Sequence, residues 1–220
     1  MPARKVILAT GETYHIFNRS IRQTPLFTNK KEFKIFLKAT RYYLQRKPPV
    51  KFCFYRLQPN TYKLDFSKPL VKLINYCLMP DHFHFCLTQL VEDGIRKFIH
   101  RLATSYSHYF NIKYKQKGPV FESKFKAVRV ESQEQLIHLS RYIHLNPVTS
   151  FLVEDPEDYE FSSYKIYLGK ETSDFVDSSL VMGDFRLTEN YKQFVLDQKD
   201  YQRELNKIKH LTLEIKYNEY

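Results

Sequence analysis

The stretch VKLINYCLMPDHFHFCLTQL, residues 71–90, decides the fold that this sequence predicts. Its first part, residues 71–78, is rich in β-branched and aromatic residues, as a central strand is. Met79, Pro80 and Asp81 follow with turn chemistry, because proline has no N–H to donate to a central ladder. We therefore predict two strands joined by this tight turn.

The second strand opens with a pair of histidines, His82 and His84, separated by Phe83. Side chains alternate between the two faces of a strand, so both imidazoles point to one side and the phenylalanine to the other. Two imidazoles held side by side can bind one divalent metal ion, such as zinc or manganese. The pattern also fits two histidines on the solvated face of an edge strand, and this stretch alone leaves both interpretations open.

The composition indicates a folded protein with a polyanionic partner. The 220 residues are 43% hydrophobic and 16% aromatic, which suffices for one sizeable domain with an appendage or for two small domains. Lys and Arg total 35 against 24 acids, a formal net charge of +11 that favours nucleic acid as the partner. The alternative is a generic basic surface that keeps the protein soluble.

The three cysteines, Cys53, Cys77 and Cys86, form no CxxC pair and are odd in number. This pattern argues against a disulfide scaffold and for a reducing compartment. Cys86 shares a strand face with His84, so a His-His-Cys zinc site is an alternative, although a buried inert thiol is the commoner case. The N-terminus shows no signal-peptide pattern and no apolar stretch approaches a membrane span, so we expect a cytoplasmic protein without a membrane partner.

Further strands and helices are predicted on both sides of this stretch from hydrophobic periodicity. The predicted strands are residues 13–18, 51–57 and 125–130. The predicted helices are residues 31–46, 95–115 and 133–145, with a polar helical tail over residues 187–213. Ser132 is the expected N-cap of the helix at 133–145, and Pro147 is expected to end that helix.

Positive charge is concentrated between residues 96 and 129, with nine Lys or Arg residues against one acid, Glu122. Aromatic residues are interleaved with these cations, although most of them are expected in the core. Cations that bind phosphates and rings on which bases stack suit single-stranded nucleic acid. With Arg19, the candidate nucleic-acid-binding residues are Arg19, Arg96, Lys97, Arg101, Lys113, Lys115, Lys117, Lys124, Lys126 and Arg129.

Tyr142 and Asn146 lie one turn apart on one flank of the helix predicted near residues 133–145. A tyrosine is a weak nucleophile at neutral pH because its pKa is about 10. A divalent ion at a scissile phosphate stabilises the developing charge, so that a tyrosine placed in line can attack phosphorus and form a covalent phosphotyrosine. Taken alone, Tyr142 also fits a packing role and Asn146 a helix C-cap.

Four segments, in this order, resemble the REP-associated tyrosine transposases, a branch of the single-tyrosine HUH transposases. They are YHIFNR (residues 14–19), LMPDHFHF (78–85), YFN…KGPVFESKF (109–125) and RYIHLNPV (141–148). The specificity comes from the YIxxNP element combined with MPxHxH, because either alone is a weak signal.

The resemblance implies a ferredoxin-like α+β sandwich, an antiparallel sheet with helices packed on it. It implies a catalytic domain over residues 1–168 and a mostly helical extension over residues 169–220. His82 and His84 would bind Mg²⁺ or Mn²⁺, with Asn146 completing the metal site. Tyr142 would cleave single-stranded DNA and keep the 5′-phosphate.

The implied protein is a DNA transposase, a single-strand endonuclease and strand transferase, that acts as a monomer or homodimer on single-stranded DNA with a hairpin. Two alternatives stay open. The first is a domesticated nucleic-acid-binding protein without cleavage activity. The second is a metal-dependent hydrolase that uses His82, His84 and Cys86.

Overall fold

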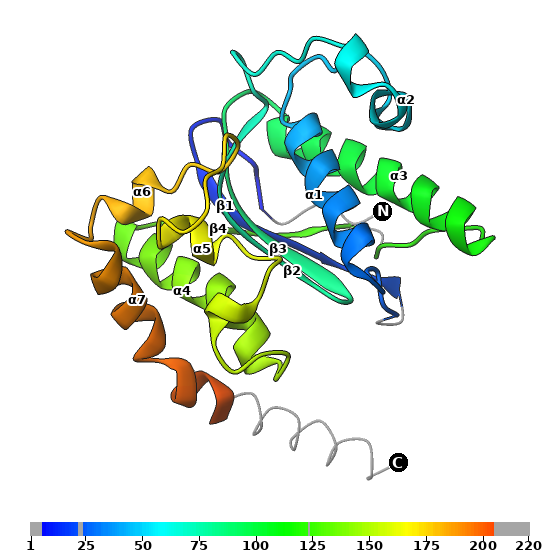
Figure 1. Cartoon of the computed structure of the whole chain (residues 1–220). Helices are drawn as coiled ribbons and strands as arrows, with labels where there is room; N and C mark the ends of the chain where they lie inside the picture. Colours follow the sequence, from blue (N-terminus) through cyan, green and yellow to red (C-terminus); the bar gives the residue numbers. More distant parts are fainter. Residues whose placement is uncertain (1–5, 22–23, 123, 205–220) are drawn as a thin grey trace.

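The computed structural model describes residues 6–21, 24–122 and 124–204 of the chain, and its centre is a four-stranded antiparallel sheet (Figure 1). The strands are β1 (Thr13–Arg19), β2 (Val71–Met79), β3 (His82–Gln89) and β4 (Lys126–Arg129). Their order across the sheet is β2-β3-β1-β4, and helices connect β1 to β2 and β3 to β4. This is the predicted ferredoxin-like α+β arrangement.

The hairpin between β2 and β3 forms as the sequence predicts. Met79 pairs with His82 at its end, so only Pro80 and Asp81 form the turn. The backbone N–H groups of Leu26 and Phe27 donate to the Pro80 carbonyl at 2.7 and 3.0 Å. The turn before β3 is thus anchored to a second segment of the chain.

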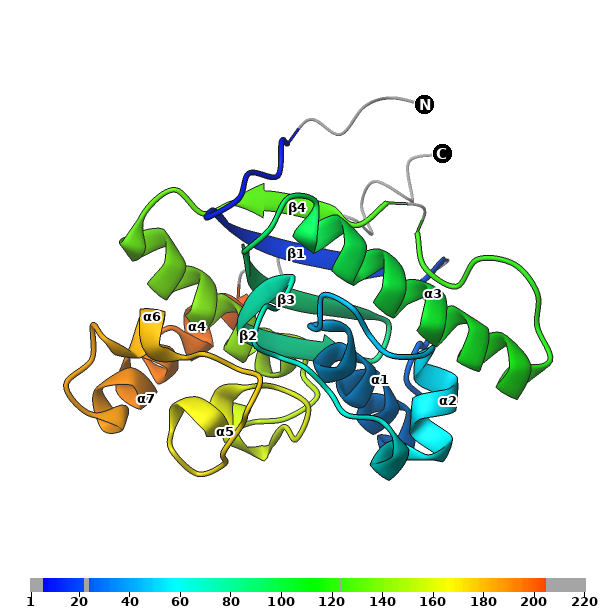
Figure 2. The ribbon, with the colours of Figure 1, turned by 90° about the horizontal axis from the view of Figure 1, so that it is seen from above.

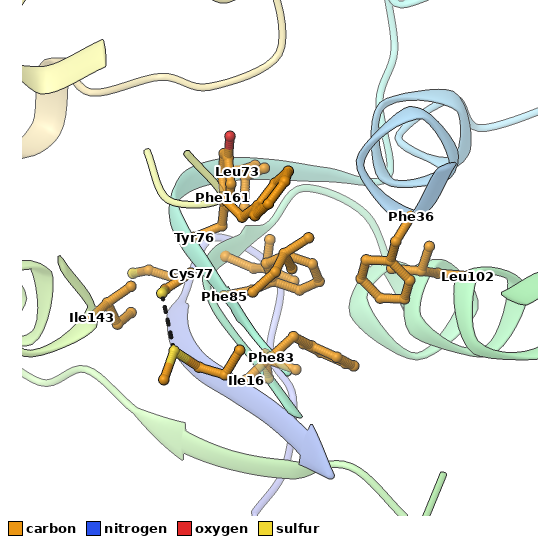
Figure 3. Packing of buried hydrophobic residues seen from close by; sticks show 14 of the residues in the cluster. Ile16, Phe36, Leu73, Tyr76, Cys77, Phe83, Phe85, Leu102, Ile143 and Phe161 are labelled. Carbon is orange, nitrogen blue, oxygen red and sulfur yellow. Dashed lines mark hydrogen bonds between the residues drawn. The ribbon is translucent and has the colours of Figure 1, made fainter. Parts of the chain in front are cut away.

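Helices cover both faces of the sheet (Figure 2). Helices α1 (Lys30–Tyr43) and α3 (Gly94–Tyr114) lie on one face, and α4 (Gln133–Thr149) lies on the other. Figure 3 shows Phe36 of α1 and Leu102 of α3 beside Phe85, whereas Ile143 of α4 points toward Cys77. All five side chains are buried, so apolar burial holds a layer of helix to each face.

The N-caps of α1 and α4 are side chains of the residue types that commonly cap helices. The Asn29 side chain accepts from the N–H of Glu32 at the start of α1, and the Ser132 side chain accepts from the N–H of Gln135 at the start of α4. These bonds satisfy backbone donors that have no partner inside the helix.

Residues 51–57, predicted as a strand, instead form helix α2 over Phe52–Leu57, so that prediction was wrong. The helix packs its rings on α1: Tyr55 stacks on Tyr42 with ring centroids 4.6 Å apart. The N–H of Phe52 donates to the Tyr43 hydroxyl at 3.3 Å. These contacts with α1 replace the backbone ladder that a strand would need.

Helix α4 continues through Pro147 to Thr149, and Ser150 is its C-cap. The prediction that Pro147 ends the helix was therefore wrong by about one turn, and Asn146 lies inside the helix. A proline removes one backbone N–H donor, and this loss falls in the last turn, where the helix is ending in any case. The N–H of Leu152 donates to the Pro147 carbonyl at 2.9 Å and closes that end.

The chain after α4 adds short elements that pack on the α4 side of the sheet (Figure 1). They are η3 (Pro156–Asp158), α5 (Tyr164–Tyr167), α6 (Ser179–Met182) and α7 (Thr188–Leu196), and η2 (Pro59–Thr61) follows α2 earlier in the chain. Tyr191 of α7 is fully buried, and its hydroxyl lies 3.0 Å from the Ser140 hydroxyl of α4. Of the predicted tail at 187–213, the part beyond residue 204 lies outside the described residues.

None of the helices in the described ranges is long and apolar enough to cross a membrane.

Candidate functional site

The two histidines predicted to share a face of β3 do so, on the side of the sheet that α4 covers. Their ring centroids are 5.0 Å apart, with the rings nearly perpendicular. His84 is 5% exposed, whereas the His82 side chain keeps 16% of its surface exposed. The pair therefore lies at the edge of the core, with His82 nearer to solvent.

Each imidazole is held through its Nδ1 atom. The Nδ1 atom of His82 lies 2.6 Å from Oδ1 of Asp81, the preceding residue in the turn. The Nδ1 atom of His84 lies 2.9 Å from the Nε2 atom of His15 on β1. Protein metal sites commonly hold a ligating histidine in this way, with its second nitrogen bonded to a carboxylate or another polar group. The Nε2 atoms of His82 and His84 are then the two available donors.

Burial keeps two of these rings neutral. It lowers the pKa of His15 to about 4 and holds the pKa of His84 well below its ordinary value, where His82, His15 and Arg19 add to the effect. At Asp81 burial opposes ionisation, but the hydrogen bond to His82 and the charge of Arg19 outweigh it and lower the pKa. Neutral imidazoles beside an ionised carboxylate are the forms that bind a cation.

Tyr142 on α4 lies against the face of the sheet that carries His82 and His84, here called the histidine face. Its ring centroid is 5.7 Å from that of His84 and 6.0 Å from that of His15, edge-on in both cases. The side chain is still 40% exposed, so a substrate can approach it. Burial of the remainder raises the pKa of Tyr142, and the Asn146 side chain partly offsets this. The phenol is therefore protonated at neutral pH and requires activation to attack phosphorus.

Asn146 lies one turn after Tyr142 and is 7% exposed. Its Nδ2 atom donates to the Tyr142 backbone carbonyl at 2.8 Å. That bond fixes the amide on the same flank of α4 as the phenol and leaves the amide oxygen as the atom suited to a cation.

The donors present fit a divalent ion. In the described part of the chain, no group of three or more His, Cys, Asp or Glu side chains is arranged to hold a metal, so a third protein ligand would be the Asn146 amide. Two imidazole nitrogens and one amide oxygen, with water at the remaining positions, suit Mn²⁺ better than an all-oxygen ion such as Mg²⁺.

The zinc alternative with Cys86 is disfavoured. Cys86 is fully buried, and burial raises the pKa of its thiol. Within the described ranges, no three His, Cys, Asp or Glu side chains are grouped so as to hold a metal, so Cys86 does not complete a site with His82 and His84.

The predicted nucleic-acid-binding residues separate into groups, and two of them lie on the histidine face. Strand register puts Arg19 opposite His82, and Lys126 opposite Phe17. The Arg19 Nε atom is 3.8 Å from Asp81, and the Lys126 ammonium is 5.8 Å from the Phe17 ring centroid. A partly exposed aromatic ring with cations on either side is suited to a nucleotide.

Five other predicted cations have identified partners within the protein. Their partners are Asp93 for Arg96, the Glu92 carbonyl for Lys97, the Gln45 and Arg46 carbonyls for Arg101, Glu32 for Lys113 and Glu12 for Arg129. The other three, Lys115, Lys117 and Lys124, are exposed at the end of α3 and in the segment that follows it, and Lys124 also interacts with another residue of the protein. The basic segment is therefore not one continuous surface.

Sequence reasoning did not assign His15 or Phe17 to the site. The rings of His15 and Phe17 are stacked with centroids 4.8 Å apart, and Phe17 also stacks on His84 at 5.8 Å. The available signal was their common face in residues 13–18, but only the pairing of β1 with β3 puts that face beside His84.

Comparison with known protein families finds a similarity over part of the chain. Residues 66–146 match the family model described as Transposase IS200 like. This segment contains the β2–β3 hairpin, α3 and most of α4, and with them His82, His84, Tyr142 and Asn146. Over these residues the chain is therefore similar to the IS200-like transposases.

A solved structure is similar over most of the chain: a REP-associated tyrosine transposase bound to a REP hairpin. The TM-score is 0.55 at 14% identity, covering 80% of this chain and 94% of that one. At this identity the similarity establishes the fold, and with the family match it confirms the predicted resemblance to the REP-associated tyrosine transposases. No curated protein sequence matched significantly.

Proposed function

We propose that this protein is a DNA transposase that cleaves and rejoins single-stranded DNA through a covalent bond to Tyr142. The observation that carries the proposal is the position of the Tyr142 ring, 5.7 Å from the His84 ring and partly open to solvent. A phosphodiester bound over His82 and His84 would lie within reach of the phenol. In this geometry one group attacks while others stabilise charge, as phosphoryl transfer requires.

The proposed cleavage step transfers one phosphoryl group. The Tyr142 oxygen forms a bond to phosphorus and gives up its proton, the bond from phosphorus to the 3′ oxygen breaks, and a 3′-hydroxyl leaves. The 5′-phosphate stays on the tyrosine, so the reverse reaction with a new 3′-hydroxyl rejoins strands without ATP. A Mn²⁺ or Mg²⁺ ion held by His82, His84 and Asn146 would stabilise the charge that develops on the phosphoryl oxygens.

The chain's own residues orient the DNA in this proposal. Arg19 and Lys126 would hold phosphates on either side of the cleaved one. The ring of Phe17, on β1 between β3 and β4, would stack on an unpaired base. His15 and Asp81 would keep the two ligating imidazoles in place. The substrate we propose is single-stranded DNA beside a hairpin, as in the similar transposase that was solved with a REP hairpin.

The proposed site of action is the cytoplasm. All three cysteines are free thiols, two of them buried, which suits a reducing compartment.

The test is covalent capture. The protein is incubated with Mn²⁺ and a pool of hairpin oligonucleotides with randomised single-stranded flanks, and the products are separated on a denaturing protein gel. Because the 5′-phosphate is retained, a label at the 3′ end should remain on the protein, and a label at the 5′ end should be released. Tyr142→Phe should abolish the adduct, and Tyr201→Phe, at an exposed tyrosine that is not one of the proposed site residues, should leave it unchanged.

Each other outcome rejects the proposal in a different way. An adduct that persists in Tyr142→Phe would exclude this tyrosine as the nucleophile. Free cleavage products without an adduct would support the hydrolase. Specific hairpin binding without cleavage would support the domesticated binding protein.

A further inference from the structure

A groove on the face of the sheet opposite the histidines takes no part in the proposed reaction. It lies between α2 and α3, with α1 as its floor, and encloses about 810 Å³. Figure 2 shows α2 beside α1 and α3, across the sheet from α4. A volume of this size holds a ligand of one or two nucleotides, since small-molecule pockets are commonly about 300–1,000 Å³.

The groove is basic. Lys51, Arg56, Arg101 and Lys113 line it, of which Lys113 is paired with Glu32 behind the groove, and no Asp or Glu is among the lining residues. Lys51 and Arg56 are exposed and form no ion pair in the described part of the chain. A low-dielectric groove lined by one sign of charge attracts the opposite charge strongly.

The groove also presents aromatic and apolar surface. The Arg56 guanidinium lies 5.3 Å from the centroid of the Tyr109 ring, across the gap between α2 and α3. Phe54 of α2 and Ile112 of α3 are 55% and 66% exposed. Large apolar side chains that stay this exposed around one groove indicate a binding surface.

Aromatic rings interleaved with unpaired cations are the means by which proteins hold unpaired nucleotides, because bases stack on the rings while phosphates meet the cations. We propose that this groove is a second DNA site, which binds one or two unpaired nucleotides. A paired base keeps its faces stacked inside the duplex, so an unpaired base is the better fit to the rings. The inference rests on the proposed function only in taking DNA as the polyanion.

The two sites lie on opposite faces of the sheet, so one nucleotide cannot occupy both. The groove therefore binds a different segment of the DNA from the one held beside Tyr142. It would retain a substrate or product strand while the phosphodiester at the other face is cut or exchanged.

The test measures binding of a fluorescent oligothymidylate of about 20 nucleotides by anisotropy, without divalent metal and at several salt concentrations. The double variant Lys51→Glu with Arg56→Glu should weaken binding about tenfold or more. It should also reduce the salt slope, which is the steepness of the fall in log affinity with log salt concentration, by about one to two. The matched control, Lys31→Glu with Arg186→Glu, changes the net charge equally at exposed positions outside the groove and should weaken binding less than about threefold.

Cross-linking locates the bound strand. An oligonucleotide that carries 5-iodouracil should cross-link on irradiation to Tyr109 or Phe54, as mapped by mass spectrometry. Equal loss of affinity in the double variant and its control, or cross-links only on the histidine face, would overturn the inference. It would also be overturned if an oligoglutamate peptide competed for the groove as well as the oligonucleotide, because the site would then suit acidic peptides.

The proposed function and this inference fail separately. If the groove variants bind like the control while the Tyr142 adduct still forms, only the groove is rejected. If cross-links map to Tyr109 or Phe54 but no adduct forms, the cleavage reaction is rejected and the groove stands.

Discussion

The Nε2 atom of His15 lies 2.9 Å from the Nδ1 atom of His84, in a contact that joins β1 to β3. One of the two nitrogens donates a proton and the other accepts it, so the contact couples the tautomers of the two rings, and His84 can bind a metal through Nε2 when its Nδ1 is the donor. With Asp81 on His82, both imidazoles of the pair are oriented through Nδ1. The histidine face is therefore a set of three rings rather than two.

Removing the His15 ring should weaken metal binding without removing a ligand. We expect His15→Ala to raise the dissociation constant for Mn²⁺ about 10–100-fold, because the His84 ring loses the contact that orients it. Isothermal titration calorimetry with Mn²⁺ and no DNA measures this directly. His100→Ala, at an exposed histidine on α3, is the control. Equal Mn²⁺ affinity in both variants would show that the contact has no effect on the metal.

Two cations on β4 should differ in their effect on DNA binding. The Lys126 ammonium lies near the Phe17 ring on the histidine face, whereas Arg129 is paired with Glu12 at 2.7 Å. Lys126→Ala should weaken binding of single-stranded DNA and lower the salt slope by about one, because a phosphate contact is lost. Arg129→Ala should leave the slope nearly unchanged. Equal effects in an anisotropy titration would contradict the assignment of the nucleotide path to Phe17.

The buried carboxylate of Glu32 should make the free energy of unfolding decrease as the pH is lowered into the acid range. It accepts hydrogen bonds from Lys113 at 2.5 Å, Tyr114 at 2.6 Å and the N–H of Thr28 at 2.6 Å. Burial opposes ionisation, but these bonds outweigh it and lower the pKa of Glu32 below 4.5. The folded state then prefers the ionised form. The stabilisation is present above pH 4.5 and is lost as the pH falls through the lower folded value.

Glu32→Gln isolates this contribution. The variant should be about 1–3 kcal/mol less stable at neutral pH, because buried donors lose a charged acceptor. The stability difference from wild type should shrink as the pH falls below the ordinary pKa of a carboxylic acid. Urea denaturation at a series of pH values measures it, and a constant difference would show that Glu32 is not ionised in the folded protein.

A buried network ties helix α7 to the helix that carries Tyr142. The Tyr191 hydroxyl of α7 lies 2.7 Å from Nδ1 of His144, whose Nε2 lies 2.8 Å from the Ser163 hydroxyl. Burial lowers the pKa of His144 to about 3, so its ring is neutral at physiological pH. Tyr191→Phe leaves one of these buried groups unpaired and should destabilise the fold by about 1–3 kcal/mol in urea denaturation. Tyr201→Phe, at an exposed position, should change stability by less than about 0.5 kcal/mol.

Two predictions from the sequence were wrong because they rested on local signals alone. Residues 51–57 form a short apolar run, and such a run fits a strand or a helix equally until its packing partner is known. Here the partner is α1, whose Tyr42 and Tyr43 side chains contact the segment in its helical form. Pro147 is a sound stop signal in general, but it falls where the helix has only one partial turn left, so the missing donor costs little.

The sequence by itself determined the hairpin of β2 and β3, the common face of His82 and His84, and the one-turn spacing of Tyr142 and Asn146. These are local properties: a proline turn, a period of two along a strand and a period of 3.6 along a helix.

Only the tertiary structure decided what those residues meet. It brought the Tyr142 ring against His84 and supplied His15 as the partner of that ring, because strand order and register act between segments far apart in the chain. It also separated the basic residues into paired and available ones, since the acids that neutralise Lys113 and Arg129 come from α1 and from the residue before β1. Such pairings depend on distance in space, which residue spacing along the chain does not contain.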